Sequence, residues 1–361
     1  MCCASLQHGF ARWTFVDGAP CSSALPSTRA SYYQWRPQAK ETWRFVASAF
    51  VSKVLSLIDA FTSGYQDSGS DIAFNLNSCE DVHVICPITD PKPESDSGWC
   101  FPDTEDGILE ALEKGASHLW ANTILFASHP LQTSTRIGSF KDRVRVVGHG
   151  PLVVEKYDDK ELVNNLLRRD GRFTMPRSWS LHESPTLEQD IQSQGVQFPV
   201  VAKPIRGRGS HGVRVCHSLD ELVAHARSLF AESPAIMLEE FLAGEEATVT
   251  VMPPTPGNSN YWSLPVVTIF NHIDGIAPYN GVVAVTANSR VISAAEQGNS
   301  TYAEVARECE QAAQLLGVTA PIRVDVRRFK DSPDSRFALF DLNMKPVGCS
   351  FHPFASLICS I

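Results

Sequence analysis

Apolar residues recur at two different spacings in the first half of the chain. Helical spacing over 43–61 and 103–115 alternates with short apolar runs at 82–85, 123–127 and 143–147. Apolar positions three or four residues apart predict helices, whereas short apolar runs predict strands. The alternation of the two predicts an open α/β sheet with helices on its faces.

The second half follows another pattern. Helices are predicted at 158–170, 218–230 and 301–316, the last two opening on Ser218-x-x-Glu221 and Thr301-x-x-Glu304, which have the form of capping boxes. Alternating, hairpin-like runs lie between these helices and predict antiparallel strands. These runs are 198–203, 212–216, 235–239, 246–252, 264–270, 281–286, 322–329 and 336–342. This half is therefore predicted to be α+β.

Size, charge and cysteine spacing narrow the class of protein. With 361 residues the chain is expected to form more than one domain. The net charge of −9 argues against nucleic acid as the main partner. The ten cysteines include no C-x-x-C pair, so reduced thiols in the cytoplasm are expected. No apolar run reaches the roughly 20 residues of a membrane span.

A glycine-rich turn between two strands is the first candidate for chemistry. Lys203 ends one strand, and a short turn precedes the next strand, 213–215. Uncovered backbone N–H groups in such a turn can approach a polyphosphate, and the lysine adds a positive charge. The alternative is a surface hairpin without a ligand. The small residues of the turn are Gly207, Gly209, Ser210 and Gly212.

Acidic residues on two predicted strands form the second candidate. Alternation places Arg323, Asp325 and Arg327 on one face of 322–328, and Asp341 and Asn343 on one face of the partner strand. If the hairpin pairs in register, the three oxygen-bearing side chains converge, which suits magnesium. The alternative is a solvated strand face of mixed charge.

The order of these parts resembles the ATP-grasp superfamily, most closely its D-alanine–D-alanine ligase branch, over roughly residues 120–348. No G-x-x-x-x-G-K-[ST] motif supports a P-loop NTPase, and neither H-R-D nor D-F-G supports a protein kinase. The motifs that carry the resemblance are Asp159-Lys160, Val201-Ala-Lys203-Pro with the glycine turn, the segment 238–246, Arg323-x-Asp325 and Asp341-x-Asn343.

The resemblance implies the fold class α/β and α+β: an ATP-grasp fold, two α+β subdomains clasping ATP, preceded by an open α/β N-terminal substrate domain. Residues 1–150 would form that first domain, with an irregular start of about 40 residues. Residues 151–232 would form the central ATP-grasp subdomain. Residues 233–361 would form the C-terminal one, whose end could be truncated.

The resemblance also assigns roles to residues. Lys160 and Lys203 would hold the nucleotide phosphates, Glu246 would bind the ribose hydroxyls, and Arg323 would stabilise the transferring phosphoryl group. His129, at the end of the run 123–127, would lie near the acceptor substrate; the alternative is a buried, structural histidine. The turn closing over the β- and γ-phosphates would be Gly207, Gly209, Ser210, His211 and Gly212, with Ser210 and Lys203 taking part in catalysis. The adenine slot would be lined by Glu239, Glu240, Phe241 and Leu242. The magnesium ligands would be Asp325, Asp341 and Asn343.

The implied activity is an ATP-dependent carboxylate–amine ligase that forms an amide through an acyl phosphate and releases ADP and phosphate. Its cofactors would be ATP and Mg²⁺, with Mn²⁺ as an alternative ion. Its partners would be a small-molecule carboxylate and an amine, and the cytoplasmic protein could assemble as a homodimer. The alternatives are a nucleotide-binding protein of the same fold without catalysis, and a phosphotransferase. Two departures stand out. Asp341 replaces a more common glutamate, and a basic residue that contacts the γ-phosphate from the middle strands has no clear counterpart; Arg290 is a candidate substitute, and the alternative is an exposed charge.

Overall fold

A computed structural model describes residues 43–48, 69–79, 82–207, 209–255, 257–277 and 288–344. The chain divides into two compact units, Met1–Pro37 and Gln38–Ile361, and all described residues belong to the second. Everything that follows concerns that second unit.

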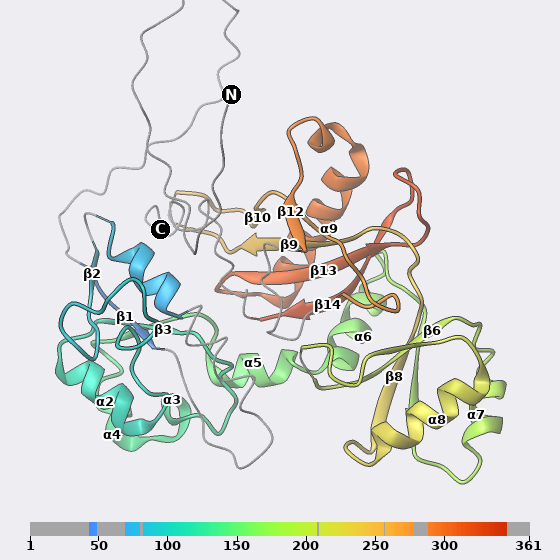
Figure 1. The fold of residues 1–361 in the computed structure, drawn as a ribbon, viewed down its shortest axis with the longest axis horizontal. Helices are drawn as coiled ribbons and strands as arrows, with labels where there is room; N and C mark the ends of the chain where they lie inside the picture. Colours follow the sequence, from blue (N-terminus) through green and yellow to red (C-terminus); the bar gives the residue numbers. More distant parts are fainter. Residues whose placement is uncertain are drawn as a thin grey trace, which may run out of the picture. The chain divides into compact units, whose positions relative to one another are not determined.

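The first sheet is parallel, as the alternation of helices and strands predicts. Its strand order is β2-β1-β3-β4, and every neighbouring pair is parallel. The helix 69–76 and the helices α2 to α4 belong to the same part of the chain (Figure 1). The strands are β1 (Trp43–Ser48), β2 (Val82–Val84), β3 (His118–Ala121) and β4 (Arg145–Val147). The helices are α2 (Glu105–Glu113), α3 (Pro130–Thr133) and α4 (Thr135–Gly138).

Two predicted elements in this part are wrong. The start of the helix predicted over 43–61 is strand β1, because its backbone pairs with β2 and β3; residues 49–61 lie outside the described part. The strand predicted over 123–127 is irregular, and the sheet uses β3, just upstream, instead. Ladder pairing ends at Ala121, and the Ala127 N–H donates to the Glu155 carboxylate rather than to a strand.

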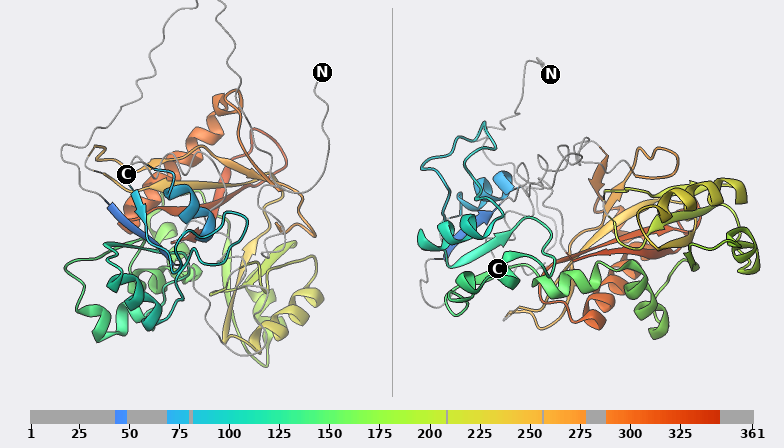
Figure 2. Two further views of the ribbon diagram at one scale, coloured as in Figure 1. Left: turned by 60° about the vertical axis from the view of Figure 1, so that its left-hand side comes forward. Right: turned by 90° about the horizontal axis from the view of Figure 1, so that it is seen from below.

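The second sheet is antiparallel, with strand order β5-β8-β6-β7. Helix α8 contacts three of these strands and packs beside α7, so the two helices cover one face (Figures 1 and 2). Buried leucines, valines and isoleucines from both layers form one core cluster. The strands are β5 (Ser178–His182), β6 (Val200–Pro204), β7 (Arg214–Cys216) and β8 (Ala235–Glu240), and the helices are α7 (Leu187–Ser193) and α8 (Leu219–Phe230).

The third sheet has the order β12-β11-β9-β13-β14, with β10 added on β9, and α9 packs against it (Figure 1). The run predicted as one strand over 264–270 is split at Pro265, which has no N–H for the ladder. The run predicted at 281–286 lies outside the described residues. The strands are β9 (Glu246–Met252), β10 (Trp262–Ser263), β11 (Val267–Ile269), β12 (Ser289–Val291), β13 (Ile322–Arg328) and β14 (Phe337–Asn343); α9 is Ser300–Leu316, preceded by the 3-10 helix η2 (Glu296–Gly298).

The hairpin of β13 and β14 contains a β-bulge. Asp325 pairs with Asp341, but the next residue, Val326, pairs with Leu339, so Phe340 is the additional residue. A bulge leaves the extra residue out of the regular ladder and redirects the strand. The bulge therefore sits directly beside the acidic pair.

Helices α5 (Pro151–Tyr157) and α6 (Lys160–Asp170) join the first sheet to the second. α6 begins at an Asp159 cap and ends at Gly171 in the left-handed conformation, as predicted. Ser218 likewise caps α8, whereas α9 is capped by Asn299 and not by the predicted Thr301. The Asn299 side chain reaches the N–H of Thr301, so the helix starts earlier than its apolar pattern indicates.

The predicted division into three parts stays a prediction. One observation bears on its last boundary: β8, placed in the third part, pairs with β5 and β6 of the second. α5, β5 and α7 have no counterpart among the predicted elements.

Cys86, Cys100, Cys216 and Cys309 are free, but Cys79 is disulfide-bonded, against the expectation of reduced thiols. The cysteine spacing carries no signal for this bond. Within the described residues, no helix combines the length and apolarity needed to span a bilayer.

Gly212 allows the turn after β6 to lie close to α8, which leads to a prediction. A Cβ built there would lie 2.7 Å from Leu229 Cδ2 and 3.1 Å from Pro204 Cγ, and φ is +67°. Gly212→Ala is expected to lower the free energy of unfolding by about 1–3 kcal/mol through strain and crowding. Gly171→Ala is the control, because φ is +79° there but no atom lies within 4 Å. Urea unfolding of both variants would contradict the packing argument if the two losses were equal.

Candidate functional site

One face of the third sheet carries a continuous row of polar side chains. The register places Arg327 opposite Glu246, Asp325 opposite Thr248, and Arg323 opposite Thr250. Positions two residues apart on a strand share a face and lie about 7 Å apart. The opposite face is apolar, since Ile322, Val324 and Val326 are fully buried. The polar face carries Glu246, Thr248 and Thr250 from β9, Arg323, Asp325 and Arg327 from β13, and Asp341 and Asn343 from β14.

The predicted convergence of Asp325, Asp341 and Asn343 is present in the fold. Asp325 and Asp341 are direct cross-strand partners, which places their Cβ atoms about 5 Å apart. Asn343 Nδ2 donates to Asp325 Oδ2 over 3.1 Å. Arg323 forms an ion pair with the same oxygen, 2.9 Å from its Nη2.

Burial and neighbouring charge act differently on the two carboxyl groups. Burial raises the pKa of Asp325, and the nearby Arg323 guanidinium only partly offsets this. Burial also acts on Asp341, but the charges of Lys160, Lys203 and Arg323 outweigh it and hold its pKa below the ordinary value. Burial therefore disfavours the ionised form of Asp325, whereas the neighbouring cations favour the ionised form of Asp341.

These residues fit a magnesium ion. Asp325 Oδ1 is buried and accepts no hydrogen bond from any described residue, so a hard cation would satisfy it. Magnesium favours one or two carboxylates together with waters and phosphate oxygens, and two carboxylates with an amide oxygen match that set. A protein cage of three or more Asp, Glu, His or Cys side chains does not occur within the described residues.

Lys203 lies where the second and third sheets meet. Its Nζ is 2.5 Å from Glu239 Oε2 and donates to the Phe340 carbonyl over 3.2 Å. Both charged groups are almost fully buried, and Asn164 donates to the other oxygen of Glu239 over 2.9 Å. The bulge places the Phe340 carbonyl next to this lysine, so the bulge links the two sheets at the site.

Lys160 connects the glycine turn to the acidic pair. Its Nζ donates to the Gly207 carbonyl over 3.1 Å and lies 3.2 Å from Asp341 Oδ1. The capped start of α6 fixes the position of this lysine. Two lysines, Arg323 and two carboxylates thus gather around the end of the hairpin. A polyphosphate with a metal ion is the ligand class that such an arrangement suits.

The glycine turn connects two antiparallel strands, as predicted, and packs against α8. Gly209, Ser210 and Gly212 all have left-handed backbone conformations. The Gly212 carbonyl accepts a hydrogen bond from His225 Nε2 at 2.9 Å. His211 is exposed and lies 2.8 Å from Glu232, so its side chain faces this carboxylate rather than either lysine. The phosphate role predicted for the turn remains a prediction.

The segment after β8 crosses from the second sheet to the third. Leu242 is buried, whereas Glu240 turns to the edge and pairs with Arg177. The Phe241 ring lies 5.2 Å from the Arg327 guanidinium. Glu246 then starts β9 on the polar face. The four residues predicted to line the adenine slot, Glu239, Glu240, Phe241 and Leu242, therefore point in different directions, and only their backbone is continuous.

His129 has a structural environment. It caps α3 by accepting from the Leu131 N–H over 3.1 Å, and its Nε2 lies 2.5 Å from Asp103. Both side chains are buried, and Thr123 donates to the other Asp103 oxygen. His129 was expected at the end of a strand, but it lies at the start of the short helix α3.

Arg290 forms an ion pair with Glu296 at the surface, so the Glu296 carboxylate already neutralises the charge of this arginine.

The sequence assigns no role to three residues that contact the predicted site residues. Asn164 and His272 have no motif around them, so no local signal identifies them. Arg327 is placed by alternation on the strand face of Arg323 and Asp325, as the structure confirms, but its position alone indicates no role.

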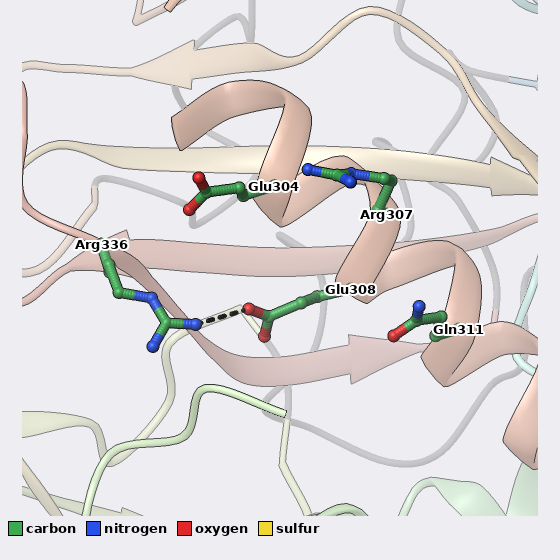
Figure 3. Close-up of a pocket in the computed structure, with 5 residues that line it drawn as sticks. All are labelled: Glu304, Arg307, Glu308, Gln311 and Arg336. Carbon is green, nitrogen blue, oxygen red and sulfur yellow. Dashed lines mark hydrogen bonds and ion pairs between the residues drawn. The ribbon is translucent and has the colours of Figure 1, made fainter. Parts of the chain in front are cut away.

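A distinct pocket of about 220 Å³ lies on α9, away from all these residues (Figure 3). Figure 3 shows Arg336 directed at Glu308, with which it forms an ion pair of 3.0 Å. Four of the five side chains that line the open pocket are charged, and two of them, Glu308 and Arg336, already contact each other and Thr174. It contains none of the predicted site residues, and we do not assign it a ligand. Its lining is Glu304, Arg307, Glu308, Gln311 and Arg336.

Comparison with known proteins identifies the family. The sequence model described as D-ala D-ala ligase C-terminus matches residues 172–359, slightly more than half of the chain. The chain belongs to the D-ala D-ala ligase C-terminus family. The matched range includes Lys203, the glycine turn and the acidic hairpin, and it leaves Lys160 and the first sheet outside.

The curated relatives match this chain either over a short region or at low identity. A D-alanine–D-alanine ligase of Aquifex aeolicus is 36% identical over 94 residues, 26% of this chain and 31% of that protein. A carbamoyl phosphate synthase large chain of Clostridium beijerinckii is 22% identical over 274 residues, 74% of this chain and 23% of that protein. The chain thus spans about a quarter to a third of the length of these curated relatives.

A solved structure confirms the expected fold. The D-alanine–D-alanine ligase of Bacillus anthracis complexed with ATP superposes with a TM-score of 0.59, covering 89% of this chain and 93% of that one at 17% identity. This family member therefore has the ATP-grasp fold, and the predicted mixture of α/β and α+β parts is confirmed.

Proposed function

We propose that this protein uses ATP to activate a carboxylate and joins it to an amine. The observation that carries the proposal is the direct pairing of Asp325 with Asp341 across the β13–β14 hairpin, with Lys160 ion-paired to Asp341. Relatives named D-alanine–D-alanine ligase and carbamoyl phosphate synthase large chain add support, because the first name describes the joining of two small amino acids.

The polar strand face supplies an order for the parts of the substrate. Glu246 lies at one end, the Asp325–Asp341 pair lies two residues further, and Arg323 with Asn343 lies two residues beyond that. These positions are about 7 Å apart along the strands, and ribose, triphosphate and reacting carboxylate would follow each other in the same order. The γ-phosphate would then lie over the acidic pair and next to Arg323, which is ion-paired with Asp325.

In the first step, a carboxylate oxygen of the acid attacks the γ-phosphorus, the bond to the β-phosphate oxygen breaks, and ADP leaves. Both reactants are anionic, so Lys160, Lys203 and Arg323 reduce their repulsion and stabilise the charge on the transferring group. Magnesium, held by Asp325, Asp341 and Asn343, would neutralise phosphate charge when bound. The product of this step is an acyl phosphate.

In the second step, the amine attacks the carbonyl carbon, phosphate leaves, and a proton departs from the nitrogen. Acyl phosphates hydrolyse readily, so water must be excluded while the amine binds. The turn 207–212 would serve as a lid; its Ser210 would contribute a hydroxyl group close to the phosphates. Loops of this kind often move before chemistry starts.

The test is a screen of amino acids and small acids, singly and in pairs, for ADP formation by the purified full chain with Mg-ATP. The expected result is ADP and phosphate that appear only when an acid and an amine are both present, with an amide product in the mass spectrum. ADP formation accompanied by a phosphorylated product without any amine would instead establish a phosphotransferase. Binding of Mg-ATP without turnover for any pair would favour a nucleotide-binding protein, and the absence of binding would overturn the proposal.

A further inference from the structure

The Glu246 carboxylate contacts Arg327 and His272, which lie on different segments of the chain. This arrangement extends the proposed function. Arg327 faces it across β9 and β13, and its Nη1 lies 3.3 Å from Glu246 Oε2. His272, which follows β11, places its Nε2 2.9 Å from the same oxygen. All three side chains are largely buried, with exposed fractions of 9% for Glu246, 12% for Arg327 and 19% for His272.

Arg327 does more than pair with Glu246. Its Nε donates to the Gly244 carbonyl over 3.1 Å, and its Nη1 donates to the Gly275 carbonyl over 2.6 Å. Its guanidinium also lies over the Phe241 ring. One side chain therefore joins the crossing segment 241–246 to the loop that carries His272.

Gly275 shows how closely these two segments pack. A Cβ at this position would lie 3.1 Å from Phe241 Cε2, and φ is +79°. The loop therefore approaches Phe241 more closely than a side chain would comfortably allow. Arg327 and this contact therefore bring Phe241, Glu246 and His272 together in one packed cluster.

Both contacts to the Glu246 carboxylate end on Oε2, and no described residue donates a hydrogen bond to Oε1. A carboxylate fixed through one oxygen presents the other at a defined position, so a ligand that donates to it loses less entropy on binding. Hydroxyl groups that donate to a carboxylate form charge-assisted bonds, which are about twice as strong as neutral ones.

We propose that Arg327 and His272 are positioning residues that fix Glu246 as the acceptor for the two ribose hydroxyls of the nucleotide. This inference rests on the proposed function, because it takes Glu246 as the ribose-binding residue. Neither side chain touches the nucleotide in this proposal. Each acts through Glu246, so its effect should depend on whether the nucleotide carries ribose hydroxyls.

The test compares Mg-ATP with Mg-2′,3′-dideoxyATP by isothermal titration calorimetry of the full chain. We expect the wild type to bind dideoxyATP at least about tenfold more weakly than ATP, because dideoxyATP cannot form the charge-assisted hydrogen bonds to Glu246. Arg327→Met, which keeps an unbranched stem under Phe241, should weaken ATP about tenfold and dideoxyATP by less than about twofold. His272→Leu should do the same, whereas His272→Gln keeps a donor and should restore most of the preference.

Several outcomes would overturn the inference. Equal losses for both nucleotides would show that these residues support the fold only. Unchanged ATP binding in Arg327→Met and His272→Leu would show that Glu246 needs neither of them. A wild type that binds ATP but does not distinguish it from dideoxyATP would remove the ribose role of Glu246 and leave the ligase proposal intact. A wild type that binds no Mg-ATP would overturn the proposed function together with this inference. Should Arg327→Met fail to fold, the two His272 variants decide, because that side chain lies on a loop.

Discussion

Asp325→Asn is expected to lower ATP-dependent ADP formation by about 10²-fold or more, the scale of removing one electrostatic contact to a transferring group. The substitution keeps the shape of the side chain and removes the charge that would hold magnesium. Burial already raises the pKa of Asp325, and the amide oxygen of the variant can still accept hydrogen bonds from Arg323 and Asn343, so the fold should lose little stability. The loss should therefore be in turnover and in the magnesium concentration needed for half-maximal rate.

Asp334→Asn provides the matched control. It makes the same chemical change in the exposed turn of the same hairpin, where no predicted site residue lies. Both variants should melt within a few degrees of the wild type, and the control should keep its full rate. Turnover of Asp325→Asn within twofold of the wild type, at any magnesium concentration, would contradict the metal assignment.

Lys203→Met is expected to lower the free energy of unfolding by about 3–5 kcal/mol, because it leaves the buried Glu239 carboxylate without its cation. Removal of one partner of a buried ion pair costs far more than replacement of both. Lys203→Met/Glu239→Gln should therefore recover most of the stability, since Asn164 can still bond to the new amide. Urea unfolding measures each step.

The same pair of variants separates the two roles of Lys203. The double variant should be folded but still bind Mg-ATP poorly, because one of the two lysines proposed to hold the phosphates is missing. Calorimetry on the double variant thus tests the ligand role without the complication of unfolding. Wild-type affinity for Mg-ATP in the double variant would show that Lys203 only stabilises the protein. A double variant as unstable as Lys203→Met would show that the ion pair with Glu239 does not account for the loss of stability.

The sequence predicts the acidic hairpin well because alternation fixes which face each side chain occupies. Arg323, Asp325, Asp341 and Asn343 could all be placed from a period of two, and β13 and β14 pair as that pattern requires. The bulge at Phe340 could not be predicted, since the strand contains no glycine or other residue that marks a bulge.

Prediction failed where tertiary contacts override local pattern. Residues 43–48 have helical spacing but lie between two parallel strands, so pairing decides their conformation. His129 was placed at a strand end because 123–127 is apolar, yet the ladder uses the preceding residues and leaves this histidine to cap α3. His272 and Asn164 were missed because contacts of long sequence separation leave no local signature.

The bulge at Phe340 makes the length of β14 as important as its composition. Deletion of Phe340 would restore a regular ladder and leave Asp341 opposite Asp325, because Phe340 is the only residue by which the two registers differ. It would also withdraw the carbonyl that Lys203 uses. Substitutions along this hairpin keep the backbone carbonyl at position 340, whereas deletion of this residue removes the contact that joins the two sheets even though the two acidic residues still pair. Relatives that keep the site should therefore vary in the turn 330–335 and hold the spacing from Phe340 to Asn343 constant.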